Sequence, residues 1–177
     1  MNSVLSILSL SLIFSVFLTC KPMKNRQMKA DFSNKKIICP DDGVCTFEVL
    51  KNKSLLIKTD GIGANYPVLL NGKTTVLKFE YKRNEIPNTQ DGNYSEIVYI
   101  EIPPKVSKLK LRDADLKNAK ILYSRLCFCR GQTGSYPINK GTLFISKISE
   151  NEYNMALDFK TDKVPQIITS INETFKL

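Results

Sequence analysis

The clearest structural signal in the chain is Tyr153-Asn154-Met155-Ala156-Leu157-Asp158-Phe159-Lys160. Its odd-numbered positions are large and apolar, whereas its even-numbered positions are small or polar. A period of two residues is that of a β-strand, in which successive side chains point to opposite faces. The stretch therefore predicts a strand that packs one face on a core and turns the other toward solvent.

The same alternation recurs along the chain. Two further clear cases lie at 45–50 and 74–81, and other strand candidates lie at 54–59, 94–102, 121–129, 142–148 and 166–171. Turn signals separate them at Asp60-Gly61, Asn71-Gly72, Asp91-Gly92, 131–134 and Glu150-Asn151. Short strands with turns between them, and no long helical pattern, predict a mainly β fold. We expect an antiparallel β-sandwich or partly open barrel with at most one short helix.

That helix is expected at 113–120, with Asp113 as its N-cap, leading into the strand that carries two cysteines. The competing interpretation divides 114–128 into three five-residue units that resemble pentapeptide repeats. A β-helical coil needs about four such units, and nothing before or after continues the period. The helix is therefore favoured.

An apolar run at 12–18 ends near Cys20 and is followed by a basic, polar segment. A membrane span needs about 20 apolar residues, so this shorter run is more typical of a signal peptide. Phe17-Leu18-Thr19-Cys20 resembles a bacterial lipoprotein signal, in which the cysteine is lipidated and the chain is cut before it. The resemblance implies a signal peptide at 1–19 and lipidation of Cys20. An uncleaved anchor and a buried apolar segment are the alternatives.

The richness in Lys, Ile and Asn is similar to that of small lipoproteins of Bacteroidetes. Residues 39–45, Cys-Pro-Asp-Asp-Gly-Val-Cys, and 125–134, Arg-Leu-Cys-Phe-Cys-Arg-Gly-Gln-Thr-Gly, resemble uncharacterised proteins of that group. The resemblance implies a protein of the cell envelope, anchored in membrane lipid through Cys20, and implies no activity. The acidic residues of surface-export signals are missing after Cys20, which favours the periplasmic side of the outer membrane.

Residues 20–36 carry an excess of basic side chains over the single acid Asp31. We interpret them as a lipidated basic tether that lies on anionic lipid, with plain disorder as the alternative. A single β domain is expected at 37–177, which is long enough to bury a core. The formal net charge is +9, but no motif combining basic and aromatic residues predicts binding to nucleic acid. We expect an envelope partner, which the sequence does not identify.

The chain contains no His. The usual general base, the commonest zinc ligand and every His-containing nucleophile arrangement are therefore missing. No pair of carboxylates has a spacing that indicates acid–base catalysis. We expect a non-catalytic protein with a binding or scaffolding role, without catalytic residues, cofactor or metal.

Four cysteines follow Cys20: Cys39, Cys45, Cys127 and Cys129. An even number in an exported chain predicts disulfides. Cys127 and Cys129 would lie about 6.6 Å apart on one face of an extended strand, too far for a direct bond. We therefore expect two long-range bonds, from a hairpin carrying Cys39 and Cys45 to this strand. The alternative is a Cys39–Cys45 bond beside a reduced or strained Cys127/Cys129 pair.

A second functional hypothesis makes the same cysteines a four-cysteine zinc site or a thiol-redox centre of an envelope protein. Their spacings miss the usual zinc pattern, and no Cys-x-x-Cys begins a helix. An oxidising compartment also favours disulfides over thiolates. This hypothesis is kept as the alternative to a binding domain.

The most distinctive loop is 130–137, directly after the cysteine strand. Loops held by a rigid scaffold often carry binding residues. Arg130, Gln132 and Tyr136 are therefore the candidate ligand-contacting residues.

Overall fold

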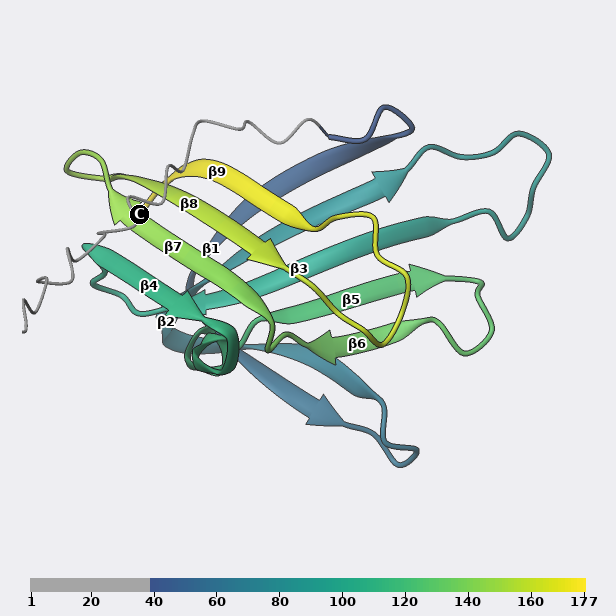
Figure 1. The fold of residues 1–177 in the computed structure, drawn as a ribbon, viewed down its shortest axis with the longest axis horizontal. Coiled ribbons are helices and arrows are strands. Elements are labelled where there is room, and N and C mark those ends of the chain that lie inside the picture. Colours follow the sequence, from purple (N-terminus) through teal and green to yellow (C-terminus); the bar gives the residue numbers. More distant parts are fainter. Residues whose placement is uncertain (1–38) are drawn as a thin grey trace, which may run out of the picture. The chain divides into compact units, whose positions relative to one another are not determined.

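The computed structural model describes residues 39–177, so the predicted signal peptide at 1–19, Cys20 and the predicted tether at 20–36 lie outside the described residues. Within 39–177, nine strands form two antiparallel sheets, and one short 3-10 helix lies between the fourth and fifth strands in the chain (Figure 1). In chain order the elements are β1 (Gly43–Thr59), β2 (Asn65–Arg83), β3 (Tyr94–Ile102), β4 (Lys108–Arg112), η1 (Asp113–Ala119), β5 (Leu122–Cys127), β6 (Gly134–Pro137), β7 (Gly141–Lys147), β8 (Glu152–Phe159) and β9 (Ser170–Lys176).

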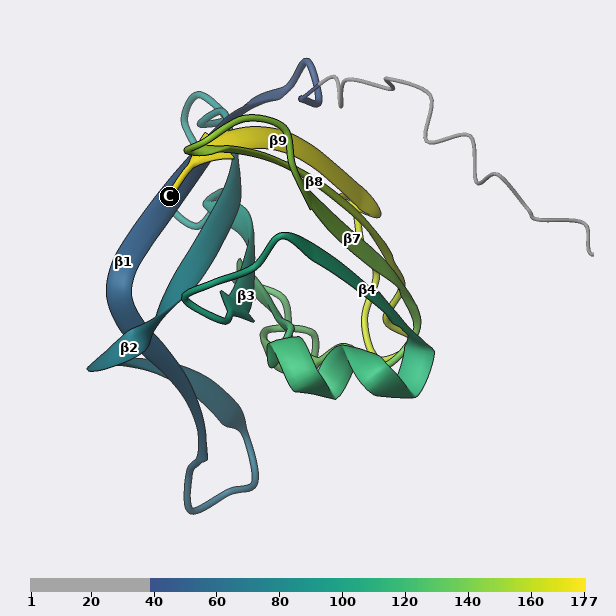
Figure 2. The same cartoon turned by 90° about the vertical axis from the view of Figure 1, so that its left-hand side faces the viewer.

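The two sheets form layers with a shared apolar core. Sheet A has the strand order β1-β2-β3-β5-β6, and sheet B has the order β4-β7-β8-β9. Figure 2 shows the layers from the side. Leu77 and Val98 of sheet A belong to the same buried cluster as Leu143 and Leu157 of sheet B, and all four are fully buried. The predicted mainly β, antiparallel fold is confirmed.

β8 shows how the alternating pattern produces this core. Tyr153, Met155, Leu157 and Phe159 are buried and belong to the inter-sheet cluster. Of the intervening residues, Asn154 and Asp158 are exposed, as the period of two predicts, whereas the small Ala156 between them is also buried.

The β1–β2 ribbon is longer than the sequence indicates, with strands of 17 and 19 residues. The predicted turn at Asn71-Gly72 is wrong, because Asn71 pairs with Lys53 inside the ladder, next to a register shift. A Cβ on Gly72 would overlap the side chain of Ser54. This glycine therefore permits a close approach of two strands at a bulge, where strands bend, rather than a turn.

Beyond the bulge the ribbon reaches the far side of sheet A. Asn65 of β2 pairs with Ser135 of β6, so sheet A is partly ringed. Leu55 is buried there in a second apolar cluster, together with Ile97 and Leu122. Ile97 and its neighbour Val98 point to opposite faces of β3, so this second cluster lies on the face of sheet A that is turned away from sheet B.

Two charged side chains hold the bent ribbon in place. The carboxylate of Glu101 accepts a hydrogen bond from the backbone N–H of Leu55 at 2.5 Å. Lys120 donates to the carbonyl of Leu55 at 3.1 Å and pairs with Glu101 at 2.8 Å. The backbone of Leu55 is thus satisfied by side chains on its unpaired edge.

η1 confirms the predicted short helix before the cysteine strand, but its start differs. Arg112 occupies the N-cap position without a side-chain cap, and Asp113 has a positive φ of 48°. The Asp113 carboxylate accepts the hydrogen bond of the Gly141 N–H at 3.0 Å instead. Residues 114–128 are divided between η1 and antiparallel β5, which contradicts the pentapeptide alternative. No helix within 39–177 is long and apolar enough to cross a membrane.

The predicted strand at 166–171 is wrong for most of its length, because β9 begins at Ser170. The Gln166 amide nitrogen donates to the carbonyls of Phe159 and Ile168 at 3.2 and 2.6 Å, and its oxygen accepts from the N–H of Thr161. The side chain of Gln166 thus replaces a strand ladder in satisfying the backbone of this connection.

Candidate functional site

A buried carboxylate lies between the two sheets at one end of β3. Glu96 is fully buried and accepts hydrogen bonds from the backbone N–H groups of Ile167 and Ile168 at 2.8 and 2.7 Å. The Tyr94 hydroxyl donates a third bond at 2.5 Å. Because Ile167 and Ile168 belong to the connection between β8 and β9, Glu96 ties that connection of sheet B to sheet A.

Arg125 lies opposite Glu96 in the β3–β5 ladder and is almost completely buried. Its Nε donates to the Tyr94 hydroxyl at 3.2 Å, and its Nη1 donates to the backbone and side-chain oxygens of Gln132 at 3.2 and 2.8 Å. The Tyr94 hydroxyl therefore bridges the buried guanidinium and the buried carboxylate by hydrogen bonds, and this bridge compensates both charges.

The ring of Tyr94 also contacts two guanidinium groups. The Cζ of Arg83 lies 4.5 Å from its centroid, and that of Arg125 lies 5.3 Å away. Burial and the hydrogen bond to Glu96 raise the pKa of Tyr94, and Arg125 offsets part of this rise. The phenol consequently stays protonated at neutral pH and keeps donating to Glu96.

A second polar chain lies at the start of β1. Asp42 accepts a hydrogen bond from the Tyr81 hydroxyl at 2.7 Å and pairs with Arg83 Nε at 3.1 Å. The bond from Tyr81 and the charge of Arg83 lower the pKa of Asp42. Asp42 is thus engaged with protein side chains.

The two disulfides among the described residues are local. Cys39 is bonded to Cys45 and Cys127 to Cys129, with Cα–Cα distances of 5.8 and 5.2 Å. The expected long-range bonds are therefore wrong, whereas the Cys39–Cys45 bond of the alternative is present. The hairpin expected around Cys39 is also replaced by a turn, closed by a bond from the Gly43 N–H to the Pro40 carbonyl, that leads into β1.

Strand order explains the local pairing. β2 and β3 lie between β1, which carries Cys45, and β5, which carries Cys127. Three strand spacings of about 4.8 Å exceed the Cα separation of about 7 Å that a disulfide can span. The direct Cys127–Cys129 bond is possible because β5 ends at Cys127 and the backbone bends at Phe128.

The four cysteines do not converge as the zinc hypothesis requires. Within residues 39–177, no group of three or more His, Cys, Asp or Glu side chains is placed to hold a metal ion.

A cavity of about 350 Å³ lies beside the Cys127–Cys129 bond. The end of β2, the β2–β3 loop, the start of β3 and the end of β5 meet there, at the right-hand side of Figure 1. Phe128 and Leu126 at its edge are 83% and 45% exposed. The lining residues are Lys82, Gln90, Asp91, Asn93, Tyr94, Ser95, Leu126, Cys127 and Phe128.

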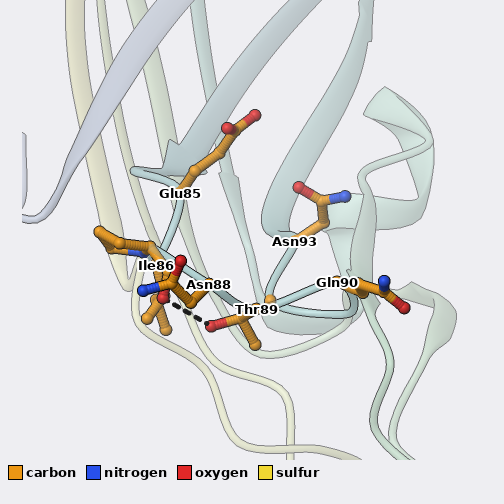
Figure 3. A pocket seen from close by; sticks show the side chains of 8 residues that line it. Glu85, Ile86, Asn88, Thr89, Gln90 and Asn93 are labelled. Carbon is orange, nitrogen blue, oxygen red and sulfur yellow. Dashed lines mark hydrogen bonds between the residues drawn. The ribbon is translucent and has the colours of Figure 1, made fainter.

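A larger hollow of about 790 Å³ belongs to the β2–β3 loop alone (Figure 3). The Thr89 hydroxyl donates to the Pro87 carbonyl within it at 3.4 Å, and Glu85 is its only charged lining residue. Gln90 and Asn93 line both cavities. We regard the smaller cavity as the candidate site, because several elements and the Cys127–Cys129 bond meet there.

The three candidate loop residues have different surroundings. Arg130 is exposed beyond the disulfide. Gln132 binds Arg125 and so holds the loop, and the Tyr136 hydroxyl donates to the Thr133 carbonyl at 3.3 Å. Their role as ligand contacts stays a prediction.

The buried group of Tyr94, Glu96 and Arg125 was not predicted from the sequence. One signal could have found it: Glu96 occupies an inward position of β3, in line with Tyr94 and Val98. A carboxylate in the apolar register of a strand requires buried partners.

Comparison of the chain with models of known protein families, with curated proteins and with solved structures finds no match.

Proposed function

We propose that this chain is an exported lipoprotein, anchored in a membrane of the cell envelope, whose disulfide-stabilised β domain binds or scaffolds an envelope partner. The observation that carries the proposal is the pairing of Cys39 with Cys45 and of Cys127 with Cys129. Disulfides persist in oxidising compartments, which supports export. Both bonds leave out Cys20, the cysteine at which the sequence resembles a lipoprotein signal.

The proposed mechanism is tethering. Acyl chains on Cys20 hold the protein at the lipid surface, and the basic residues of 21–36 add about 1 kcal/mol for each charge close to anionic lipid. The β domain then presents its loops to the partner. The 350 Å³ cavity with exposed Phe128 is the part of the described surface best suited to contact it.

The experiment is metabolic labelling with an alkyne fatty acid in a bacterium that processes lipoproteins. We expect the full chain to take up the label, lose residues 1–19 and sediment with membranes. Cys20→Ser should lose the label and the membrane association. The double variant Cys39→Ser/Cys45→Ser is the matched control and should keep both.

Intact mass spectrometry after alkylation measures the redox state of the cysteines. The four cysteines in bonds should react only after reduction. An unlabelled chain that still carries residues 1–19 would refute the anchor, and thiols that react without reduction would refute the disulfides.

A further inference from the structure

We propose that the Cys127–Cys129 bond is a thiol–disulfide exchange site that accepts electrons from a reduced dithiol in an exported polypeptide. The inference rests on the proposed function in requiring export, and it names the chemistry of the partner. It does not require acylation of Cys20.

Contacts other than the disulfide hold the loop that contains it. The β5–β6 ladder brings the ends of the loop together, and Thr133 Oγ1 donates to the Arg125 carbonyl at 3.1 Å. The Gln132 N–H donates to the Cys129 carbonyl at 3.0 Å, and Arg125 binds Gln132. A loop of three residues also gains little from closure by a disulfide. Reduction can therefore occur while the fold persists.

The surroundings of the bond suit an extended polypeptide. Cys127 lines the 350 Å³ cavity, and the side chains on either side of it in sequence, Leu126 and Phe128, are exposed. Gln90 and Asn93 in the same lining carry amide groups that can hydrogen-bond to a peptide backbone. Together, the cavity and the two exposed apolar side chains offer a contact surface for such a segment. A reduced segment with cysteines fits both the surface and the bond.

The exchange takes place in two nucleophilic steps. A substrate thiolate attacks Cys127 Sγ, the S–S bond breaks, and the electron pair leaves on Cys129 as a thiolate, next to Arg130 in the sequence. The second substrate thiol, after losing its proton, attacks the mixed disulfide and releases Cys127. The substrate becomes a disulfide, while Cys127 and Cys129 take up two electrons and two protons.

The Cys39–Cys45 bond provides an internal comparison. It closes a longer loop, and neither of its cysteines lines the two cavities described above. We therefore expect it to resist exchange under conditions that reduce the other bond.

The first test titrates the full chain, purified in detergent, against glutathione redox buffers. Alkylation and peptide mapping then report each pair separately. We expect Cys127–Cys129 to be half reduced at a [GSH]²/[GSSG] ratio at least about tenfold lower than Cys39–Cys45, with an unchanged near-UV circular dichroism spectrum. Reduction of both pairs together, or only on loss of that spectrum, overturns the proposal.

The second test uses a reduced peptide with two cysteines and flanking apolar residues as the probe. The full chain should oxidise one equivalent of it at least about tenfold faster than Cys127→Ser/Cys129→Ser does, and Cys39→Ser/Cys45→Ser should retain the rate. Phe128→Ser should slow the oxidation of the peptide but not that of glutathione. Equal slowing of both refutes polypeptide docking, and no oxidation by the wild-type chain refutes exchange.

The two proposals fail separately. If the chain exchanges disulfides but takes up no fatty acid, only the proposed membrane anchor is refuted. A chain that is acylated but inert toward both thiols loses only the exchange site.

Discussion

Replacing Glu96 by Gln tests whether the buried carboxylate holds the two sheets together. Gln preserves the size of the side chain but changes its chemistry. The carboxylate accepts from the N–H groups of Ile167 and Ile168 and from the Tyr94 hydroxyl. An amide offers one oxygen and turns an NH₂ donor toward the remaining donors, so either the buried N–H of Ile168 or the part-buried N–H of Ile167 loses its acceptor.

The expected loss of stability follows from these contacts. A buried donor without a partner costs about 1–3 kcal/mol, and the surviving bonds weaken because the acceptor is no longer charged. Arg125 also keeps its charge while losing the compensation that Tyr94 relays from Glu96. Removing one member of a buried pair commonly costs about 3–5 kcal/mol. We expect Glu96→Gln to lower the free energy of unfolding by about 3 kcal/mol, a large fraction of a typical stability of about 5–15 kcal/mol.

Urea unfolding of the full chain measures this loss, and hydrogen exchange at the amides of Ile167 and Ile168 localises it. Glu85→Gln is the matched control, because Glu85 is exposed in the β2–β3 loop and should change stability by less than about 0.5 kcal/mol. A loss below about 1 kcal/mol for Glu96→Gln, or unchanged exchange at the two amides, would refute the reasoning.

Three further outcomes are expected, each measured by urea unfolding. Gly141→Ala should lower the free energy of unfolding by more than about 2 kcal/mol, because φ is +138° and a Cβ would overlap the backbone of β8. Gly61→Ala should leave the free energy of unfolding nearly unchanged, because a Cβ there would lie in open space. Leu122→Ala in the second cluster should cost about 2–5 kcal/mol, against less than about 0.5 for exposed Ile62→Ala. Burial, and then the charge of Glu96, raise the pKa of Tyr123 above its ordinary 10.0, so stability should fall as pH rises above 10, and Tyr123→Phe should flatten that fall.

The strands could be predicted because alternation is a local property. β3 spans the expected residues 94–102, and β8 buries the expected face. The predicted turn at Asn71-Gly72 was wrong for an equally local reason. Glycine is common both in turns and where two strands approach closely, and only the position of Ser54 distinguishes the two cases. β9 was misplaced because Gln166 satisfies the preceding connection with its side chain, which no alternation reveals.

The candidate site depends on non-local order. Residues 94–102 and 121–129 were expected to be strands, but nothing in either segment indicates that they pair with each other. That pairing brings Glu96 opposite Arg125 and Tyr94 opposite Cys127. The donors from Ile167 and Ile168 lie 71 and 72 residues away from Glu96. The predicted cysteine pairing was wrong for the same reason, because a correct prediction would have required knowledge of the order of β1, β2, β3 and β5 in the sheet.

The local pairing also changes what the disulfides do for the protein. The chain-entropy model gives about 1.6 kcal/mol for the three-residue loop and about 2.4 for the seven-residue loop, against about 4.6 for a bond closing about 90 residues. Apolar residues of both sheets meanwhile form one extensive buried cluster. Stability within 39–177 therefore comes chiefly from that core, because neither bond joins the two sheets. A bond that contributes little to the fold can be opened at little cost, which is the condition that exchange at Cys127–Cys129 requires.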